Sequence, residues 1–267
     1  MLWQYGGEVM DNRPIGMFDS GVGGLTVYRE IKKKLPNEQI IYLGDTKEFP
    51  YGSKSKQNII ELTKNNIEFL LEYDVKLIII ACGTATSQAL KEVRKIYKVP
   101  IIGIIDPTVN YIIQNKQYKN IGIMATRGTI KSNTWEKSLK NAIPDVKIYN
   151  KECPLLAPMA EEGWVDNEIA KLTIKEYIKY FPKLDALILG CTHYPLFEKI
   201  IKEYMPDTDI INTGKVIASF LENNIEKAEF WGNMQDHIYL TDMECNFITV
   251  ANKILNSPVE IKKVEVK

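Results

Sequence analysis

The sequence of 267 residues lacks several features that mark whole classes of protein. Its 34 basic residues are balanced by 34 acidic ones, so no net charge draws the molecule to nucleic acid or to an anionic membrane. No apolar run approaches the ~20 residues that cross a bilayer. The start, MLWQYGGEVMDNR, has neither a basic segment nor a continuous apolar one, so it does not resemble a signal peptide. We therefore expect a cytoplasmic protein without nucleic-acid or membrane partners.

Cysteine and histidine are scarce, with four and two residues. The cysteines are widely spaced and form no C-x-x-C pair, so neither a disulfide framework nor a structural zinc site is predicted. A metal held by Cys82, Cys191 and His193 is a competing interpretation, but no local spacing supports it. Cys153 and Cys245 are interpreted as small buried apolar side chains, the usual role of a free cysteine.

Short apolar runs alternate with amphipathic stretches along the chain, which is typical of an α/β fold with mainly parallel sheets. The predicted strands are Ile15–Phe18, Ile40–Leu43, Leu77–Ile80, Ile101–Ile104, Ile121–Met124, Val146–Tyr149, Ala186–Leu189, Asp209–Ile211 and Ile238–Leu240. Helices are predicted between them, for example over Gln57–Leu71 and Glu244–Leu255.

The chain also repeats part of its own pattern. IGMFDSGVGG at 15–24 resembles IGIMATRGTI at 121–130, 106 residues later. IIYLGDTKEFPYG, from residue 40, is echoed at the same offset by VKIYNKECPLLAP. KLIIIACGT and DALILGCTHYP then place Cys82 and Cys191 109 residues apart. Three matches in the same order predict a duplicated α/β unit, and therefore two pseudo-symmetric halves.

Polar residues and both of these cysteines fall just after predicted strands. In open α/β sheets, ligands bind at the carboxyl ends of the strands. If the halves face each other about an approximate two-fold axis, Cys82 and Cys191 enter one cleft from opposite sides. Each cysteine is expected to end a strand and begin a helix, where backbone N–H groups and the helix dipole lower the pKa of a thiol.

Two opposed thiols suit the inversion of an amino acid at Cα, which needs a base on one face and an acid on the other. A thiolate and a thiol exchange protonation states at each turnover, so one pair serves both directions. Without a cofactor as electron sink, preorganised donors must hold the developing negative charge on the substrate carboxylate. Asp19 and His193 lie close enough in sequence to predicted strand ends to assist the thiols.

The run DSGVGG at 19–24 has a second interpretation, because a glycine-rich turn between strand and helix can hold a phosphate. It lacks the Lys–Ser/Thr ending of a Walker A loop and the spacing of a dinucleotide fingerprint, so this alternative is a weak one. The glycines can also serve only to make a tight turn.

Six motifs together resemble those of the bacterial glutamate racemases, within the aspartate/glutamate racemase superfamily. They are FDSGVGGL (18–25), GDTKEFPYG (44–52), ACGTATS (81–87), ATRGTIKS (125–132), CPLLAPMAEEG (153–163) and GCTHYPLF (190–197). The resemblance runs from about residue 14 to about residue 255.

The resemblance implies two α/β domains, 1–103 plus 213–267 and 104–212, with the active site between them. It implies that Cys82 takes the α-proton from D-glutamate and Cys191 from L-glutamate, assisted by Asp19 and His193. The residues expected to line the substrate pocket are Asp19, Ser20, Pro50, Tyr51, Gly52, Gly83, Thr84, Thr126, Thr129, Glu161 and Thr192. The family role is to supply D-glutamate for peptidoglycan in the cytoplasm without cofactor or metal, commonly as a homodimer.

One residue departs from the family pattern. Gly83 stands where the family commonly has asparagine, so a donor to the substrate is missing. An aspartate or broad-specificity racemase is therefore one alternative. A regulatory protein that binds a partner such as DNA gyrase, as is said of some family members, is another, although the zero net charge gives it no support.

Overall fold

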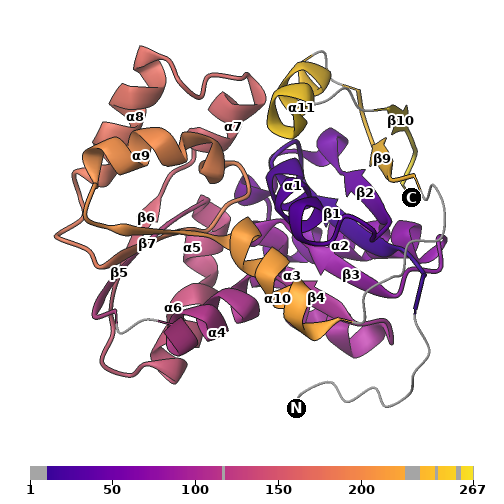
Figure 1. The fold of residues 1–267 in the computed structure, drawn as a ribbon, viewed down its shortest axis with the longest axis horizontal. Coiled ribbons are helices and arrows are strands. Elements are labelled where there is room, and N and C mark those ends of the chain that lie inside the picture. The colour runs from indigo at the N-terminus through magenta and orange to yellow at the C-terminus, as the bar shows by residue number, and fades with distance from the viewer. Residues whose placement is uncertain (1–10, 116–117, 226–234, 244–245, 257–259, 267) are drawn as a thin grey trace.

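The structure, a computed structural model, describes residues 11–115, 118–225, 235–243, 246–256 and 260–266. Two parallel sheets lie side by side, each flanked by helices (Figure 1). All strand pairings in the described residues are parallel. No described helix is both long and apolar enough to span a membrane.

The first sheet has six strands in the order β10-β9-β2-β1-β3-β4. Its strands are β1 (Ile15–Asp19), β2 (Ile40–Gly44), β3 (Leu77–Ile80), β4 (Ile101–Gly103), β9 (His237–Leu240) and β10 (Ile261–Lys263). The accompanying helices are α1 (Gly24–Lys34), α2 (Lys56–Leu71), α3 (Gly83–Ile96) and α11 (Phe247–Leu255). We call these strands and helices the six-stranded unit.

The second sheet has four strands in the order β6-β5-β7-β8. They are β5 (Asn120–Ala125), β6 (Lys147–Glu152), β7 (Ala186–Leu189) and β8 (Asp209–Asn212). With α5 (Arg127–Ser132), α6 (Thr134–Ala142), α7 (Leu156–Glu161), α8 (Glu168–Ile178) and α9 (Glu198–Tyr204), they form the four-stranded unit. Helices α4 (Ile105–Asn115) and α10 (Thr213–Asn224) pack on each other where the units meet, and α10 also packs on α1.

The predicted internal repeat is confirmed by the strand order. The order β2-β1-β3-β4 in one sheet is the order β6-β5-β7-β8 in the other, taken in the same sequence along the chain. The strands followed by Cys82 and Cys191, β3 and β7, therefore occupy equivalent places. The two cysteines lie at matching positions of two copies of one supersecondary arrangement.

The central strands form because helices cover both of their faces. Every residue of β1 and β3 is buried, as expected for continuous apolar strands in a parallel sheet. One apolar cluster includes Ile15 and Ile79 of the first sheet together with Ile121 and Ile188 of the second. Two other clusters lie almost entirely within one unit each. The units thus share part of their core while each keeps its own.

Most strands were predicted from the sequence, and the misses fall at sheet edges. Strand β6 begins at Lys147 rather than at residue 146 and runs to Glu152, because its polar residues pair with β5 as an edge strand. Strand β10, whose sequence is IKK, was not predicted since it is short, charged and paired only with β9. The predicted last helix begins at Phe247, and Cys245 lies outside the described residues.

Candidate active site

The carboxyl ends of β1, β3, β5 and β7 bring the expected site residues together between the two units. Asp19 ends β1, and Cys82 follows β3 as the residue that caps α3. Cys191 follows β7 with Gly190 between them. Both thiols are buried, with exposed fractions of 5% and 6%. They are close enough that negative charge on Cys191 raises the pKa of Cys82.

Cys82 sits in an environment that keeps it protonated. Burial is the main reason, and with the charge on Asp19 it raises the pKa of the Cys82 thiol to about 12. The thiol donates to the Ser20 hydroxyl at 3.7 Å. The backbone N–H of Ala85, at the start of α3, lowers this pKa as expected, but desolvation outweighs it, so the pKa of the thiol is raised rather than lowered overall.

The surroundings of Cys191 differ from those predicted. This cysteine does not begin an α-helix: it lies in a bend, and a two-residue turn and then a short 3₁₀ segment, Tyr194–Phe197, follow it before α9. The polar group beside the thiol is the His193 side chain rather than a helix terminus, and its Nδ1 lies 3.6 Å from the Cys191 sulfur. The predicted proximity of His193 to Cys191 is confirmed.

His193 is held between Cys191 and a carboxylate of α7. Its Nε2 lies 2.6 Å from Oε1 of Glu161, the last residue of that helix. Burial opposes the charged imidazole, yet contacts with Cys191 and Glu161 prevail and raise the pKa of His193 well above its ordinary value. Glu161, expected to line the substrate pocket, is thus engaged by His193 and by the backbone N–H of Val22 at 2.9 Å.

The glycine-rich turn after β1 makes room for this chain of groups. A β-carbon on Gly23 would lie 2.5 Å from Nδ1 of His193, and one on Gly21 would overlap the carboxylate of Glu161. The amides of the turn are already used, because Gly21 and Gly24 donate to Asp19. With Val22 donating to Glu161, little of the turn is free to bind a phosphate. The structure therefore gives the phosphate-binding interpretation no support.

Asp19 joins the two units as well as holding the turn. Its carboxylate is fully buried and accepts from the Thr192 hydroxyl at 3.1 Å, across the boundary between the units. Burial raises the pKa of Asp19 to about 6, while the charge on His193 partly offsets that rise. Asp19 and Thr192, both expected in the pocket, are in direct contact.

Three threonine hydroxyls form a cluster where the two units meet. Thr84, at the start of α3, lies 2.9 Å from Thr126 and 3.2 Å from Thr129 of the other unit. Thr126 also caps α5 by accepting from the Thr129 amide. Because hydroxyls both donate and accept, such a cluster can turn its protons toward a carboxylate.

The segment Pro50–Gly52 lies against this cluster. A β-carbon on Gly52 would lie 2.7 Å from the β-carbon of Thr126. The Tyr51 side chain, however, turns into the core, where its hydroxyl donates to Asp45 and accepts from Asn66. Only the backbone of Tyr51 is left to face the site. Pro50, which follows a cis peptide bond, is exposed.

Position 83 is filled by the other unit. A β-carbon there would overlap the carbonyl oxygen of Gly190, so the backbones of the two cysteine-bearing turns touch. A side-chain donor at this position would have no room while the two turns are in contact.

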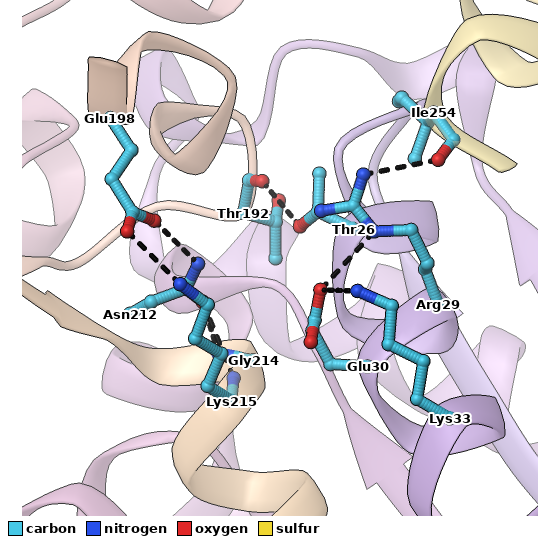
Figure 2. Close-up of polar contacts among 10 residues, drawn as sticks. All are labelled: Thr26, Arg29, Glu30, Lys33, Thr192, Glu198, Asn212, Gly214, Lys215 and Ile254. Carbon is cyan, nitrogen blue, oxygen red and sulfur yellow. Dashed lines mark hydrogen bonds and ion pairs between the residues drawn. The ribbon is translucent and has the colours of Figure 1, made fainter. Parts of the chain in front are cut away.

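Sequence reasoning missed a contact between the units at the turn that carries Cys191. Thr26, in the first turn of α1, donates to the Thr192 carbonyl at 2.8 Å (Figure 2). Its place directly after the motif at 18–25 was the available signal, but a threonine in a predicted helix is not distinctive. Next to this contact, an open cleft of about 810 Å³ lies between α1 and α9–α10, away from the thiols and lined by charged residues such as Arg29, Glu198 and Lys215.

Among the described residues, no group of three or more His, Cys, Asp or Glu side chains is arranged to hold a metal ion. What the arrangement offers is two buried thiols, a buried imidazole between a thiol and a carboxylate, and a cluster of hydroxyls, all at one boundary. These groups suit the transfer of a proton to and from the two faces of one carbon atom.

Comparison with known proteins gives consistent matches over nearly the whole chain. Residues 15–221 match the family described as Asp/Glu/Hydantoin racemase. The glutamate racemase of Sulfurihydrogenibium sp. (strain YO3AOP1) is 42% identical over 255 residues, covering 94% of this chain and 97% of the relative.

Solved structures agree with the sequence matches. The glutamate racemase of Francisella tularensis, solved in complex with D-glutamate, aligns with a TM-score of 0.87 and 36% identity, covering 97% of this chain and 99% of the other. The Escherichia coli glutamate racemase, solved with L-glutamate and the activator UDP-MurNAc-ala, aligns with a TM-score of 0.77 and 25% identity, covering 96% and 99%.

Proposed function

Because this chain belongs to the Asp/Glu/Hydantoin racemase family and racemises glutamate, we propose that Cys82 and Cys191 are the acid and the base of that reaction. The observation that carries the proposal is their placement. Two buried thiols follow equivalent strands of a duplicated unit and meet at the boundary between the copies. The family membership implies that the D-glutamate formed serves peptidoglycan synthesis.

The two thiols begin the reaction in different states. Burial keeps Cys82 as a thiol, so it is the acid that protonates Cα when L-glutamate is the substrate. For that substrate Cys191 is the base that takes the α-proton from the opposite face. After one turnover Cys191 carries the proton and Cys82 is the thiolate, so D-glutamate is the substrate that restores the first state.

His193 and Asp19 assist from opposite sides. The imidazole, 3.6 Å from the Cys191 sulfur and backed by Glu161, is placed to exchange a proton with that sulfur. Asp19 does not contact either sulfur by a hydrogen bond among the described residues, and it acts on Cys82 through its charge. We assign Glu161 the role of partner to His193 rather than of substrate ligand.

The substrate carboxylates require donors on both units. The hydroxyls of Thr84, Thr126 and Thr129 form one group. The hydroxyls of Thr192, which donates to Asp19, and of Ser20, which accepts from Cys82, are two further candidates. The α-carboxylate carries the developing charge, so donors fixed before the reaction lower the barrier most. The substrate of this site is L- or D-glutamate, as in the two relatives solved with those ligands.

Three wider expectations remain part of the proposal. Residues 1–103 with 213–267 form one domain and 104–212 the other, and the two separate to admit substrate because the thiols are buried. The enzyme acts in the cytoplasm, and it forms a homodimer. Light scattering on the purified chain tests the last of these by giving its mass directly.

The deciding experiment follows the α-proton. The pure protein, kept reduced and free of added cofactor, is incubated in D₂O with L-glutamate, or separately with L-aspartate, and the α-proton signal and the enantiomer ratio are measured. Deuterium entering glutamate while D-glutamate appears is the expected result. Exchange without any dependence on Cys82 and Cys191, tested with the serine variants of each, would overturn the two-thiol assignment.

A further inference from the structure

Thr26 makes a contact between the units at Thr192, the residue after Cys191, and does not belong to the proposed catalytic groups. It is the third residue of α1, it is 2% exposed, and its hydroxyl donates to the backbone carbonyl of Thr192 at 2.8 Å. Figure 2 shows the two residues facing each other from α1 and from the turn after β7. Nothing in the motif comparison singles out this hydroxyl.

The orientation of the carbonyl that accepts from Thr26 affects the position of His193. It belongs to the peptide group that joins Thr192 to His193, and Thr192 itself follows Cys191 directly. Rotation of that peptide plane would turn the His193 backbone and move its imidazole relative to the Cys191 sulfur. Backbone bonds of the 3₁₀ type flank this peptide, from Tyr194 to the Cys191 carbonyl and from Leu196 to the His193 carbonyl. The Thr192 carbonyl has no such donor three residues on, because Pro195 lacks an N–H.

Two bonds from the six-stranded unit therefore hold one residue of the other unit. The Thr192 side chain donates to Asp19, and the Thr192 carbonyl accepts from Thr26. Asp19 and Thr26 are both fixed to the same turn, since Asp19 accepts from the Gly24 amide and the Thr26 amide donates to the Gly23 carbonyl. The start of α1 and the turn before it thus bind the turn that carries Cys191 and His193 through two hydrogen bonds.

We propose that Thr26 is a positioning residue, which sets the orientation of Cys191 and His193 when the two units close. The inference rests on the proposed function of Cys191 as the residue that takes the α-proton of L-glutamate. The hydroxyl acts only in the closed arrangement, because donor and acceptor belong to different units. Closing of the two units therefore also aligns Cys191.

Two substitutions separate the hydroxyl from the packing of the side chain. Thr26→Val keeps the shape and removes the donor, whereas Thr26→Ser keeps the donor and removes a methyl group. A matched control is Thr208→Val, because the Thr208 hydroxyl donates to the Leu184 carbonyl at 3.3 Å, is also buried, and joins residues of the four-stranded unit at its far end. Each valine variant loses one buried hydroxyl-to-carbonyl bond.

The first readout is steady-state turnover in both directions. Leaving the Thr192 carbonyl without its donor is expected to lower kcat/KM about tenfold for L- and D-glutamate alike, since equilibrium fixes their ratio. Thr26→Ser and Thr208→Val are expected to stay within about twofold of the unsubstituted chain. Thermal unfolding is measured for all three, so that a variant that fails to fold is recognised.

The second readout is one that a merely structural role would not move. With Cys191 misaligned, proton abstraction from L-glutamate becomes more rate-limiting, so the isotope effect on kcat/KM with α-deuterated L-glutamate rises in Thr26→Val. The effect with α-deuterated D-glutamate, whose proton goes to Cys82, falls. Restoration of both values in Thr26→Ser would complete the expected result.

Equal changes of both isotope effects, or a loss in Thr208→Val as large as in Thr26→Val, would overturn the positioning role. So would a Thr26→Val variant with unchanged kinetics. These outcomes are distinct from failure of the proposed function, which shows itself independently if Cys191→Ser retains racemisation.

Discussion

The carbonyl oxygen of Gly190 occupies the space that a β-carbon on Gly83 would need. Gly190 precedes one thiol and Gly83 follows the other, so the contact joins the two cysteine-bearing turns by their backbones. Backbone atoms cannot rotate out of the way as a flexible side chain can. Any larger residue at position 83 must hold the two units apart or shift one of the turns.

Substitution of Gly83 is therefore expected to reduce turnover. Gly83→Ala should lower kcat/KM by about tenfold or more, since proton transfer depends steeply on the spacing of acid, base and substrate. Gly83→Asn should be slower still, although it restores the family's usual residue. Kinetics on both enantiomers, with circular dichroism to check the fold, provide the test, and an asparagine variant faster than the native chain would contradict this account.

Cys82→Ser and Cys191→Ser are each expected to abolish racemisation in both directions, with a loss of at least about 1000-fold. A serine hydroxyl is too weakly acidic to replace either thiol in proton transfer. The control is Cys153→Ala, which removes an equally buried thiol whose sulfur contacts only the Lys151 carbonyl by hydrogen bond among the described residues. That variant should keep activity within about twofold, as measured by polarimetry.

Asp19 should make stability fall as the pH rises. Its folded pKa of about 6 lies above the ordinary 3.8, so the unfolded chain loses this proton first. Between pH 4 and 7 the folded state is thus penalised by about 3 kcal/mol, at 1.36 kcal/mol for each unit of pKa. The Asp19→Asn variant lacks this pH-dependent contribution to the free energy of unfolding.

The measurement is urea unfolding of both proteins at several pH values. The difference between their free energies of unfolding should change in favour of Asp19→Asn as the pH rises through 4 to 6. Taking the difference removes the contribution of other titrating groups that the two proteins share. A difference independent of pH would show that Asp19 titrates normally in the folded molecule.

Glu161→Gln should lower the pKa of His193. The substitution removes the carboxylate 2.6 Å from Nε2, one of the two contacts that raise this pKa, so the imidazole becomes neutral at a lower pH. The chain has only two histidines, which makes their NMR titration curves easy to separate. The matched control is Glu162→Gln, because Glu162 bonds to Asn246 on the surface and should leave the titration unchanged.

Much of the fold was predictable because it depends on two patterns that are visible in the sequence, apolar runs and an internal repeat. Continuous apolar runs specified the buried strands, and the repeat specified the equivalence of β3 and β7. Edge elements escaped since β10 consists of IKK and gains its structure only by pairing with β9. Local patterns carry little information about a strand that is short, charged and mostly exposed.

The sequence predicted which residues form the site, but not which of them contact one another. Motifs named His193, Glu161 and Asp19, but only the structure shows that Glu161 supports His193 and that Asp19 accepts from Thr192. The error about the pKa of Cys82 has the same origin: the sequence shows the helix start, whereas desolvation depends on what the other unit covers. Interactions between the units are what sequence patterns omit.

The order of the strands along the chain has a consequence for synthesis on the ribosome. The last strand of the second sheet ends at Asn212, whereas the first sheet receives β9 only at His237 and β10 only at Ile261. The inserted middle segment can thus complete its sheet while the outer segment still waits for its final strands. Since β9 pairs with β2, the nascent N-terminal portion must keep one strand edge uncovered until residues 237–240 have been synthesised.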